Sequence, residues 1–162
     1  MNFKKIDVSK IFLKKMNRSF YNISYFGEKI TFTTPLMSCA FGVEKEYSNY
    51  LMKLRFKNMN DEHSDLFDFI SLLEDYIQKT LQLPIKSNIR KSSKFNPLLM
   101  VKLRRRNDKF MVVIEGDTLE NVLDIEKNMT FQCVVQINNV WYNETKCSYK
   151  LTVNRIIFNS RV

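Results

Sequence analysis

The sequence predicts a mainly β protein with one main helix, arranged as a β-barrel that the helix plugs or crosses. About six or seven segments are rich in aromatic and β-branched residues, a composition that is typical of strands. A single stretch, residues 61–81, instead repeats its apolar residues at helical spacing. With 162 residues, the chain has the length of one domain with a substantial core.

The first 19 residues are predicted to form a basic N-terminal segment, ahead of a main domain over residues 20–162. Residues 3–16 mix apolar side chains with five lysines at a loosely helical spacing. This pattern fits a short helix that caps the domain, a flexible basic arm or a helix on a membrane surface. We favour the capping helix, because apolar side chains of this kind usually pack against a partner.

Strand character begins at Phe20. Residues 20–26 and 29–34 flank a plausible turn at Gly27-Glu28, so they predict a hairpin. Pro35 cannot donate a hydrogen bond to a strand ladder, and residues 35–42 are therefore expected to form a loop or a bulged edge.

The strand predicted at Tyr50–Lys57 has the most informative pattern in the chain. Its apolar residues alternate with three cations, which are Lys53, Arg55 and Lys57. Because successive side chains of a strand point to opposite faces, the cations share one face and the apolar residues the other. Residues two apart on a strand are about 6.6 Å apart, roughly the phosphate spacing of an extended nucleic-acid strand.

The predicted helix over residues 61–81 carries one apolar stripe, formed by Leu66, Phe69, Ile70, Leu73, Ile77 and Leu81. Asn60 is the expected N-cap, and Pro84 ends the helix. His63 near the helix start is expected at the surface, which fits a helix-surface residue better than a catalytic base. The outer face of the helix is acidic, and this disfavours a nucleic-acid contact there.

The second half of the chain predicts four more strands. After a polar, basic loop over residues 85–96, strands at 97–106 and 110–115 flank the turn pair Asn107-Asp108. The first of these strands repeats the alternation of cations and apolar residues with Lys102, Arg104 and Arg106. The last two strands are expected at 129–138 and 147–158, and a change of parity in the final strand predicts a bulge near Asn154-Arg155.

The net charge of +9 is unevenly distributed along the sequence. Residues 1–60 carry a net charge of +7, residues 61–84 carry −5 and residues 85–162 carry +7. An acidic insert between two basic blocks indicates a local positive potential, as a nucleic-acid footprint would have. A basic protein whose charges are simply solvated is the alternative interpretation.

The cysteine and histidine inventory disfavours a metal site. Three cysteines without CxxC spacing and one histidine cannot build a conventional zinc site or a disulfide framework, so we expect no metal, no other cofactor and reduced thiols. The sequence also has no transmembrane run and no recognisable signal peptide, which favours an intracellular protein without a membrane partner. A cluster at Glu115, Asp117 and Glu120 could serve a metal-dependent nuclease, although a polar strand end explains it more simply.

Basic residues interleaved with aromatics predict single-stranded nucleic-acid binding, in which cations follow the phosphates and aromatic rings stack on bases. The candidate cations lie on or beside predicted strands: Lys53, Arg55, Lys57, Lys102, Arg104, Arg106 and Lys150. The candidate stacking residues are Phe41, Tyr47, Trp141, Tyr142 and Tyr149. A core position is at least as good an interpretation for each of these rings. Either DNA or RNA can be the single-stranded ligand at this point.

The order of elements resembles the phage replicative single-stranded DNA-binding proteins of the OB-fold type, and more closely their relatives in large nucleocytoplasmic DNA viruses. The similar motifs are Thr33-Thr34-Pro35-Leu36-Met37, Ala40-Phe41-Gly42-Val43, Tyr50–Phe56, Phe131–Ile137, Val140-Trp141-Tyr142-Asn143 and Lys150-Leu151-Thr152-Val153. They span roughly residues 20–158. The resemblance implies an OB-fold-like barrel whose two basic strands line the DNA groove, with stacking residues near Phe41 and Trp141. The long acidic tail of the phage members has no counterpart here, so tail-mediated recruitment is not carried over.

The prediction for function is a non-enzymatic, sequence-nonspecific single-stranded DNA-binding protein of replication, recombination or repair. Replication proteins are the expected protein partners, and self-association is left open. For a viral protein, the resemblance implies the host nucleus or a cytoplasmic virus factory. The alternative is a viral structural or packaging protein that binds nucleic acid nonspecifically through its charge.

Overall fold

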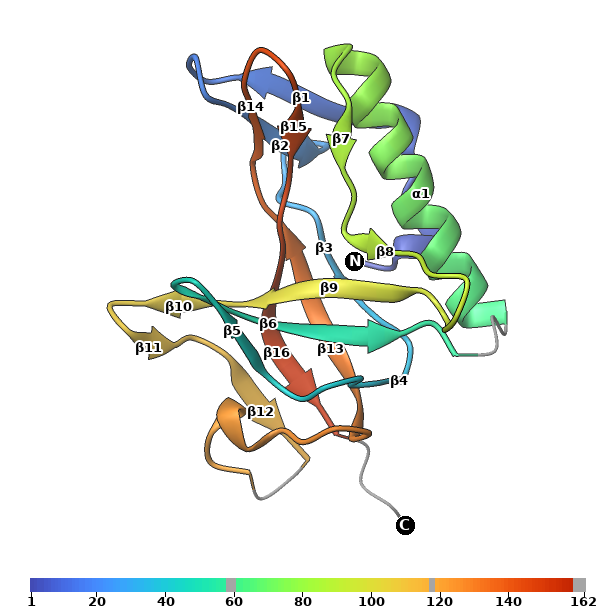
Figure 1. Ribbon diagram of the computed structural model, residues 1–162. Coiled ribbons are helices and arrows are strands. Elements are labelled where there is room, and N and C mark those ends of the chain that lie inside the picture. The colour runs from blue at the N-terminus through green and yellow to red at the C-terminus, as the bar shows by residue number, and fades with distance from the viewer. Residues whose placement is uncertain (58–60, 117–118, 159–162) are drawn as a thin grey trace.

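A β body with one long helix along its side makes up most of the protein (Figure 1). The computed structural model describes residues 1–57, 61–116 and 119–158. The predicted mainly β class with a single α-helix is confirmed. Among the described residues, no helix combines the length and the apolar character that crossing a bilayer requires.

The main sheet has nine strands. Its principal order is β3 (Thr31–Thr33), β13 (Thr130–Ile137), β16 (Leu151–Ile157), β9 (Leu98–Leu103), β6 (Asn49–Arg55) and β5 (Glu44–Glu46). Three short strands attach to it: β4 (Met37–Ser38) to β13, β8 (Ile89–Arg90) to β9, and β12 (Val113–Glu115) to β16. The pairs β16–β9 and β12–β16 are parallel and the others antiparallel.

A second sheet of five strands lies at one end of the molecule, as Figure 1 shows. Its order is β1 (Ile11–Lys15), β2 (Phe20–Tyr25), β14 (Val140–Tyr142), β15 (Cys147–Ser148) and β7 (Ile85–Lys86). A separate hairpin is formed by β10 (Arg105–Arg106) and β11 (Lys109–Phe110). Within the described residues, the helices are α1 (Asp61–Leu81) and three 3-10 turns, η1 (Phe3–Lys5), η2 (Val8–Lys10) and η3 (Val122–Asp124).

The segment 37–40 links two distant strands of the main sheet and gives it a barrel-like form. On one side β4 pairs with β13, and on the other Cys39 bridges to Leu54 of β6. The Ala40 N–H also donates to the Lys53 carbonyl at 2.8 Å. The region predicted as a loop or bulged edge after Pro35 is therefore the connection that completes the sheet.

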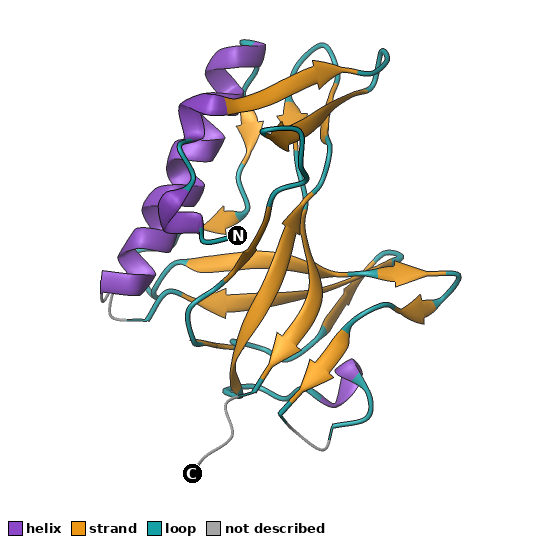
Figure 2. Ribbon diagram, turned by 180° about the vertical axis from the view of Figure 1, so that it is seen from behind, coloured by secondary structure: helices purple, strands orange, loops and turns teal. Residues whose placement is uncertain are grey.

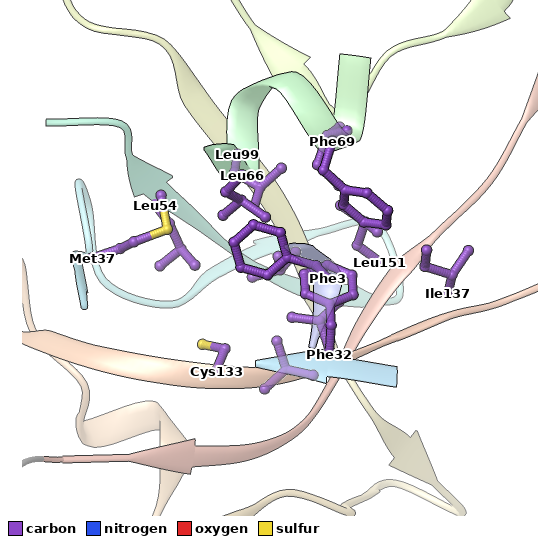
Figure 3. Packing of buried hydrophobic residues seen from close by; sticks show 14 of the residues in the cluster. Phe3, Phe32, Met37, Leu54, Leu66, Phe69, Leu99, Cys133, Ile137 and Leu151 are labelled. Atoms are coloured by element: carbon purple, nitrogen blue, oxygen red, sulfur yellow. The ribbon is translucent and has the colours of Figure 1, made fainter. Parts of the chain in front are cut away.

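The core fills the space between α1 and the main sheet (Figure 3). Five members of the predicted helical stripe are buried, and Leu81 is half-buried. The ring of Phe69 lies 5.8 Å from that of Phe3 and 5.5 Å from that of Phe32. The helix is thus held to both the sheet and the N-terminus. The expected N-cap, Asn60, lies outside the described residues.

The helical spacing in residues 3–16 leads to a different structure from the predicted capping helix. Two 3-10 turns are followed by β1, which pairs with β2 over five residues. Phe3, Ile6 and Ile11 are buried in the same core as residues of the main domain. Isoleucine, phenylalanine and leucine in succession suit a strand, and the free edge of β2 supplies the backbone partner that a helix would not need.

The hairpin predicted around Gly27 is wrong. The turn itself forms, with Phe26 at φ 49° and Gly27 at φ 79°, but only Tyr25 and Glu28 pair across it. After the turn β3 leaves β2 and joins β13 instead. This places the Phe32 side chain in the core against Phe3 and Phe69, a burial that continued pairing with β2 does not offer.

His63 is buried, contrary to the surface position expected for it. Its Nδ1 accepts the Lys57 N–H at 2.9 Å, and its Nε2 lies 2.8 Å from the Leu36 carbonyl. Because Nδ1 accepts, Nε2 carries the proton and donates. The imidazole thereby joins the end of β6 to the segment before β4.

The later strands follow the prediction with two changes. The strand predicted at 147–158 divides into β15 and β16, which belong to different sheets, and the strands beside the turn pair are shortened. Asn107 and Asp108, at φ 51° and 63°, form the expected turn, but the flanking strands are short. The chain opens out after Leu103 and after Phe110, so that β12 can pair with β16. The predicted bulge is confirmed, since the register between β13 and β16 skips Asn154.

Candidate nucleic-acid interface

The outer face of β6 and β9 carries the predicted cations. Met52 and Val101 face each other across the ladder and are buried, as are Leu54 and Leu99. The alternate pairs point outward and set Leu51 opposite Lys102 and Lys53 opposite Met100. The alternation predicted from the sequence is confirmed within these strands, because each buries its apolar file and turns its half-buried cations to the opposite face.

A groove of about 290 Å³ lies over this outer face. Its floor is Leu51 of β6 with Met100 and Lys102 of β9. Lys150, just before β16, lies along it, and Tyr47 stands in the β5–β6 turn. The β7–β8 region completes it with Lys86, Asn88 and Arg90. The groove lining therefore combines apolar side chains with four cations and one carboxylate, that of Glu46.

Two of these cations, Lys102 and Lys150, lie close enough to oppose each other. Burial lowers the pKa of Lys102, and the neighbouring charge of Lys150 lowers it further. Two ammonium groups that repel each other in a partly enclosed site favour an anion between or beside them. The two charges thus favour a phosphate group at this point of the groove.

Tyr47 offers the groove an open aromatic ring. Its backbone has a left-handed conformation, with φ 56°, in the turn between β5 and β6. Its side chain is 91% exposed. The sequence named Tyr47 as a candidate for base stacking, and the structure places it beside Lys102 and Lys150 in the groove lining.

Trp141 extends the same surface onto the second sheet. Strand register puts Trp141 opposite Ser148, and Ser148 opposite Lys86, so the three side chains share one face. Lys86 and Ser148 line the groove, and Trp141 is the next residue along this row. Its ring is 43% exposed and packs 5.0 Å from that of Phe20. One face of the indole is thereby supported while the ring stays partly open.

Tyr142, next to Trp141, has a packing role. Its hydroxyl donates to the Asn17 carbonyl at 2.9 Å, and its ring lies 5.0 Å from that of Tyr21. Lys15 approaches the same ring, with its ammonium 5.9 Å from the centroid. Tyr142 therefore fixes β14 to the β1–β2 hairpin, and its half-buried ring has less surface to offer a base than Trp141.

Tyr149 takes the core position that the sequence left open. The side chain is buried, and its hydroxyl donates to Glu74 Oε2 of α1 at 2.5 Å. The Asn88 side-chain N–H donates to the Tyr149 carbonyl at 3.1 Å, and the Asn88 backbone N–H to Glu74 Oε2 at 2.9 Å. Burial, followed by the charge of Glu74, raises the pKa of Tyr149 well above its usual value. Tyr149 anchors the groove wall to the helix and has no face for a base.

Arg55 differs most from its predicted role as a phosphate ligand. Its Nη1 donates to Asn128 Oδ1 at 2.8 Å, to Ser38 Oγ at 3.2 Å and to the Cys39 carbonyl at 3.4 Å. Its Nη2 donates to the Ala40 carbonyl at 3.3 Å. The guanidinium thus fastens the segment 38–40, which links β13 to β6.

The other predicted residues do not line the groove. Lys53 forms an ion pair with Glu44 at 3.4 Å, and its ammonium stands 5.5 Å from the ring centre of Phe41, which is exposed. Lys57 is exposed just beyond the end of β6. Arg104 is exposed just before β10, and Arg106 is exposed within β10. The structure brings together Tyr47, Lys102 and Lys150, and it spreads the remaining cations over the neighbouring surface.

Lys86 and Arg90 were not among the predicted site residues. The charge of the 85–96 segment was the available signal, but without a hydrophobic pattern nothing in the sequence placed it beside β9. The short β7 and β8 pairings bring both residues to the groove. Asn88 is fixed between them by its bonds to Glu74 and Tyr149.

Glu115, Asp117 and Glu120 are the carboxylates considered for a nuclease. Glu115 forms an ion pair with Arg155 at 2.8 Å, and Asp117 lies outside the described residues. Within residues 1–57, 61–116 and 119–158, no group of three or more histidine, cysteine or acidic side chains is placed to hold a metal ion.

Comparison with solved structures relates the fold to two phage structures. The chain matches the single-stranded DNA-binding protein from bacteriophage Enc34, in a C-terminal truncation, with a TM-score of 0.54 and 10% identity over 94% of this chain and 96% of that one. It matches the same protein in complex with single-stranded DNA with a TM-score of 0.50 and 11% identity, over 94% and 97% of the two chains. The chain shares their fold. The predicted OB-fold-like class is confirmed.

Sequence comparisons add no closer relative. No family model matches the chain, and no curated protein matches it. The structural likeness covers nearly the whole chain at an identity that shows the fold alone.

Proposed function

We propose that this protein binds single-stranded DNA without sequence specificity and acts in DNA replication, recombination or repair. The observation that carries the proposal is the groove on β6 and β9, where an apolar floor meets Lys86, Arg90, Lys102 and Lys150 beside the open ring of Tyr47. The likeness of the fold to a phage protein in complex with single-stranded DNA supports the same function.

The groove chemistry suits a single strand better than a duplex. Its cations attract phosphates, which gives affinity without reading the base sequence. Leu51 and Met100 on the floor, with Tyr47 at the β5–β6 turn, offer apolar contacts and stacking to bases. A duplex hides its base faces by pairing and stacking, so it can use the cations but not these surfaces.

The direct test is a binding titration with labelled oligo-dT and a duplex of equal length, with and without Mg²⁺. We expect tighter binding of the single strand and a steep loss of affinity with salt, about 0.7 log units per log unit of salt for each neutralised phosphate. Equal affinity for both, unaffected by loss of Tyr47, would support the charge-driven packaging alternative. Metal-dependent cleavage of the oligonucleotide would support a nuclease.

Variants of the groove make the test specific to the site. Lys102→Gln with Lys150→Gln removes the two opposed ammonium groups and should lower the salt slope by about 1.4. Lys29→Gln serves as control, since this exposed lysine lies in the turn after β2 and does not line the groove. A slope that falls equally in the control would refute the assignment of the groove.

The remaining expectations are proposals of the same kind. We propose replication proteins as partners and an intracellular site of action, in the host nucleus or a cytoplasmic virus factory for a viral protein. The proposed kinship with proteins of large nucleocytoplasmic DNA viruses rests on the short sequence motifs. Binding of RNA can be compared with binding of DNA in the same titration.

A further inference from the structure

A second and larger groove, of about 660 Å³, lies between the N-terminal segment and the outer face of α1. Its apolar lining includes Phe3, Val8, Phe69 and Leu72, and the Leu72 side chain is 58% exposed. Three aspartates of α1 also line it, which are Asp65, Asp68 and Asp75. We refer to these residues together as the acidic groove. An exposed leucine among carboxylates is suited to a basic partner that also carries an apolar side chain.

The negative charge of this groove is only partly balanced within the chain. Lys79 pairs with Asp75 at 2.9 Å and Lys4 approaches Asp65 at 3.8 Å, and all four side chains are largely exposed. Exposed pairs of this kind contribute little stability and exchange readily with other partners. The lining holds four aspartates, since Asp7 joins the three of α1, against Lys4 and Lys79, so the groove is negative in a protein whose total charge is +9.

The complementary surface is present on the same chain, in the β10–β11 hairpin. Residues 104–111 carry a net charge of +3, and Met111 is 47% exposed. The hairpin is well supported, because the Arg105 guanidinium lies 4.6 Å from the ring centre of Tyr50 and 5.2 Å from that of Phe110. Lys109 and Met111 are thus presented by a projection that packs against Tyr50.

The hairpin and the helix lie at opposite ends of the molecule. Figure 1 and the reverse view in Figure 2 agree that β10–β11 project on the side away from α1. Two copies therefore cannot insert their hairpins into each other's acidic grooves at the same time. A single contact leaves one free hairpin and one free groove, so that further copies can add in the same direction.

We propose that the β10–β11 hairpin of one copy docks in the acidic groove of the next, so that copies bind head to tail along single-stranded DNA. This inference rests on the proposed function. A hairpin tip buries a small area, and a contact of that size is weak between free molecules that each carry +9. On a shared strand, the phosphates offset the repulsion and the DNA raises the local concentration of neighbours, so the contact produces cooperative binding.

The test uses charge reversal on the two surfaces. Asp68→Lys reverses an exposed residue of the acidic groove, and Lys109→Asp reverses the hairpin. Neither residue belongs to the proposed DNA groove. The third variant combines both reversals in one chain. Glu120→Lys and Lys29→Asp are matched controls that change the net charge equally at exposed positions elsewhere.

Two measurements separate intrinsic binding from contact between copies. Titration of the shortest oligo-dT that holds one copy gives the intrinsic affinity, corrected for net charge by the control variants. Titration of long poly-dT then gives the cooperativity factor, which is the gain in affinity beside an occupied site.

We expect each single reversal to lower the cooperativity factor by about fivefold or more relative to its control, at matched intrinsic affinity. The doubly reversed protein should recover it, and so should an equimolar mixture of the two single variants, because each then meets an opposite charge. Unchanged cooperativity in both single variants, or no recovery in the double variant and the mixture, would overturn the proposal. Failure to bind the short oligo-dT would instead refute the proposed function.

Discussion

Replacement of Arg55 separates a residue of the fold from a residue of the DNA groove. The sequence places Arg55 on the same strand face as Lys53, where either could contact a phosphate. In the structure its guanidinium instead bonds to Asn128 and to the segment 38–40. We predict that Arg55→Ala destabilises the protein and leaves the salt dependence of DNA binding unchanged.

The size of the effect follows from the individual hydrogen bonds. The bond to Asn128 Oδ1, at 2.8 Å, is short and charge-assisted, whereas the other three are 3.2 to 3.4 Å long. The Cys39 carbonyl keeps a partner, since it also accepts the Asn128 N–H at 2.7 Å. One strong bond and weaker ones at a partly exposed site amount to about 2–3 kcal/mol. At this chain length, that loss lowers Tm by about 5–10 °C.

Arg55→Lys sharpens the comparison, because it keeps the charge and loses the planar fork. We expect it to lose about half as much stability as the alanine variant, while a phosphate contact would tolerate lysine well. Lys53→Ala is the matched control on the same face, and its exposed ion pair with Glu44 predicts a change below about 1 kcal/mol.

Urea unfolding followed by circular dichroism measures the stability, and titration of oligo-dT at several salt concentrations measures the DNA contact. The reasoning would be refuted by an Arg55→Ala protein that unfolds at the wild-type urea concentration and whose salt slope falls by about 0.7. That result would make Arg55 a phosphate ligand after all.

Three further predictions address the groove, its anchor and the cysteines. Burial and Lys150 lower the pKa of Lys102, so affinity for oligo-dT should be full below that pKa and fall as the pH rises through it. Arginine does not titrate in this range, so Lys102→Arg should reduce the fall in affinity at alkaline pH when binding is measured over a pH series. Tyr149→Phe loses the 2.5 Å hydrogen bond to Glu74 and should lower the free energy of unfolding in urea by about 1–3 kcal/mol. A variant that loses affinity for DNA but keeps the wild-type stability would contradict the anchoring role of Tyr149. Burial raises the pKa of the Cys39, Cys133 and Cys147 thiols, so a chromogenic disulfide reagent at pH 8 should label the native protein slowly and all three thiols on unfolding; rapid native labelling would show that these thiols are accessible.

The sequence predicted what depends on local pattern. Parity along β6 and β9 correctly separated buried Met52 and Val101 from the outward Lys53 and Lys102. The helical stripe of α1 and the bulge at Asn154 follow from spacing in the same way. Each of these features is decided by neighbours within a few residues, and this is the range over which periodicity carries information.

Pairing between distant segments could not be read from the same patterns. Nothing local to β2 and β3 indicates that β3 joins β13, roughly a hundred residues later, because either pairing satisfies the alternation. The groove has the same origin. Lys86 and Arg90 reach the groove through two-residue strands, β7 beside β15 and β8 beside β9, which are too short to leave a periodic signal.

The two cations Arg55 and Lys102 show why a basic strand face is not in itself a binding site. Both lie on outward positions of adjacent strands, and their sequence contexts are nearly alike. Arg55 ends β6 where the chain must be joined to β13, and nearby backbone carbonyls take up its donors. Lys102 lies at the middle of the face, where its neighbour is another ammonium group and an anion is the missing partner. The division between structure and binding is therefore set by what lies opposite each cation, and only Lys102 is left with an electrostatic reason to bind a phosphate.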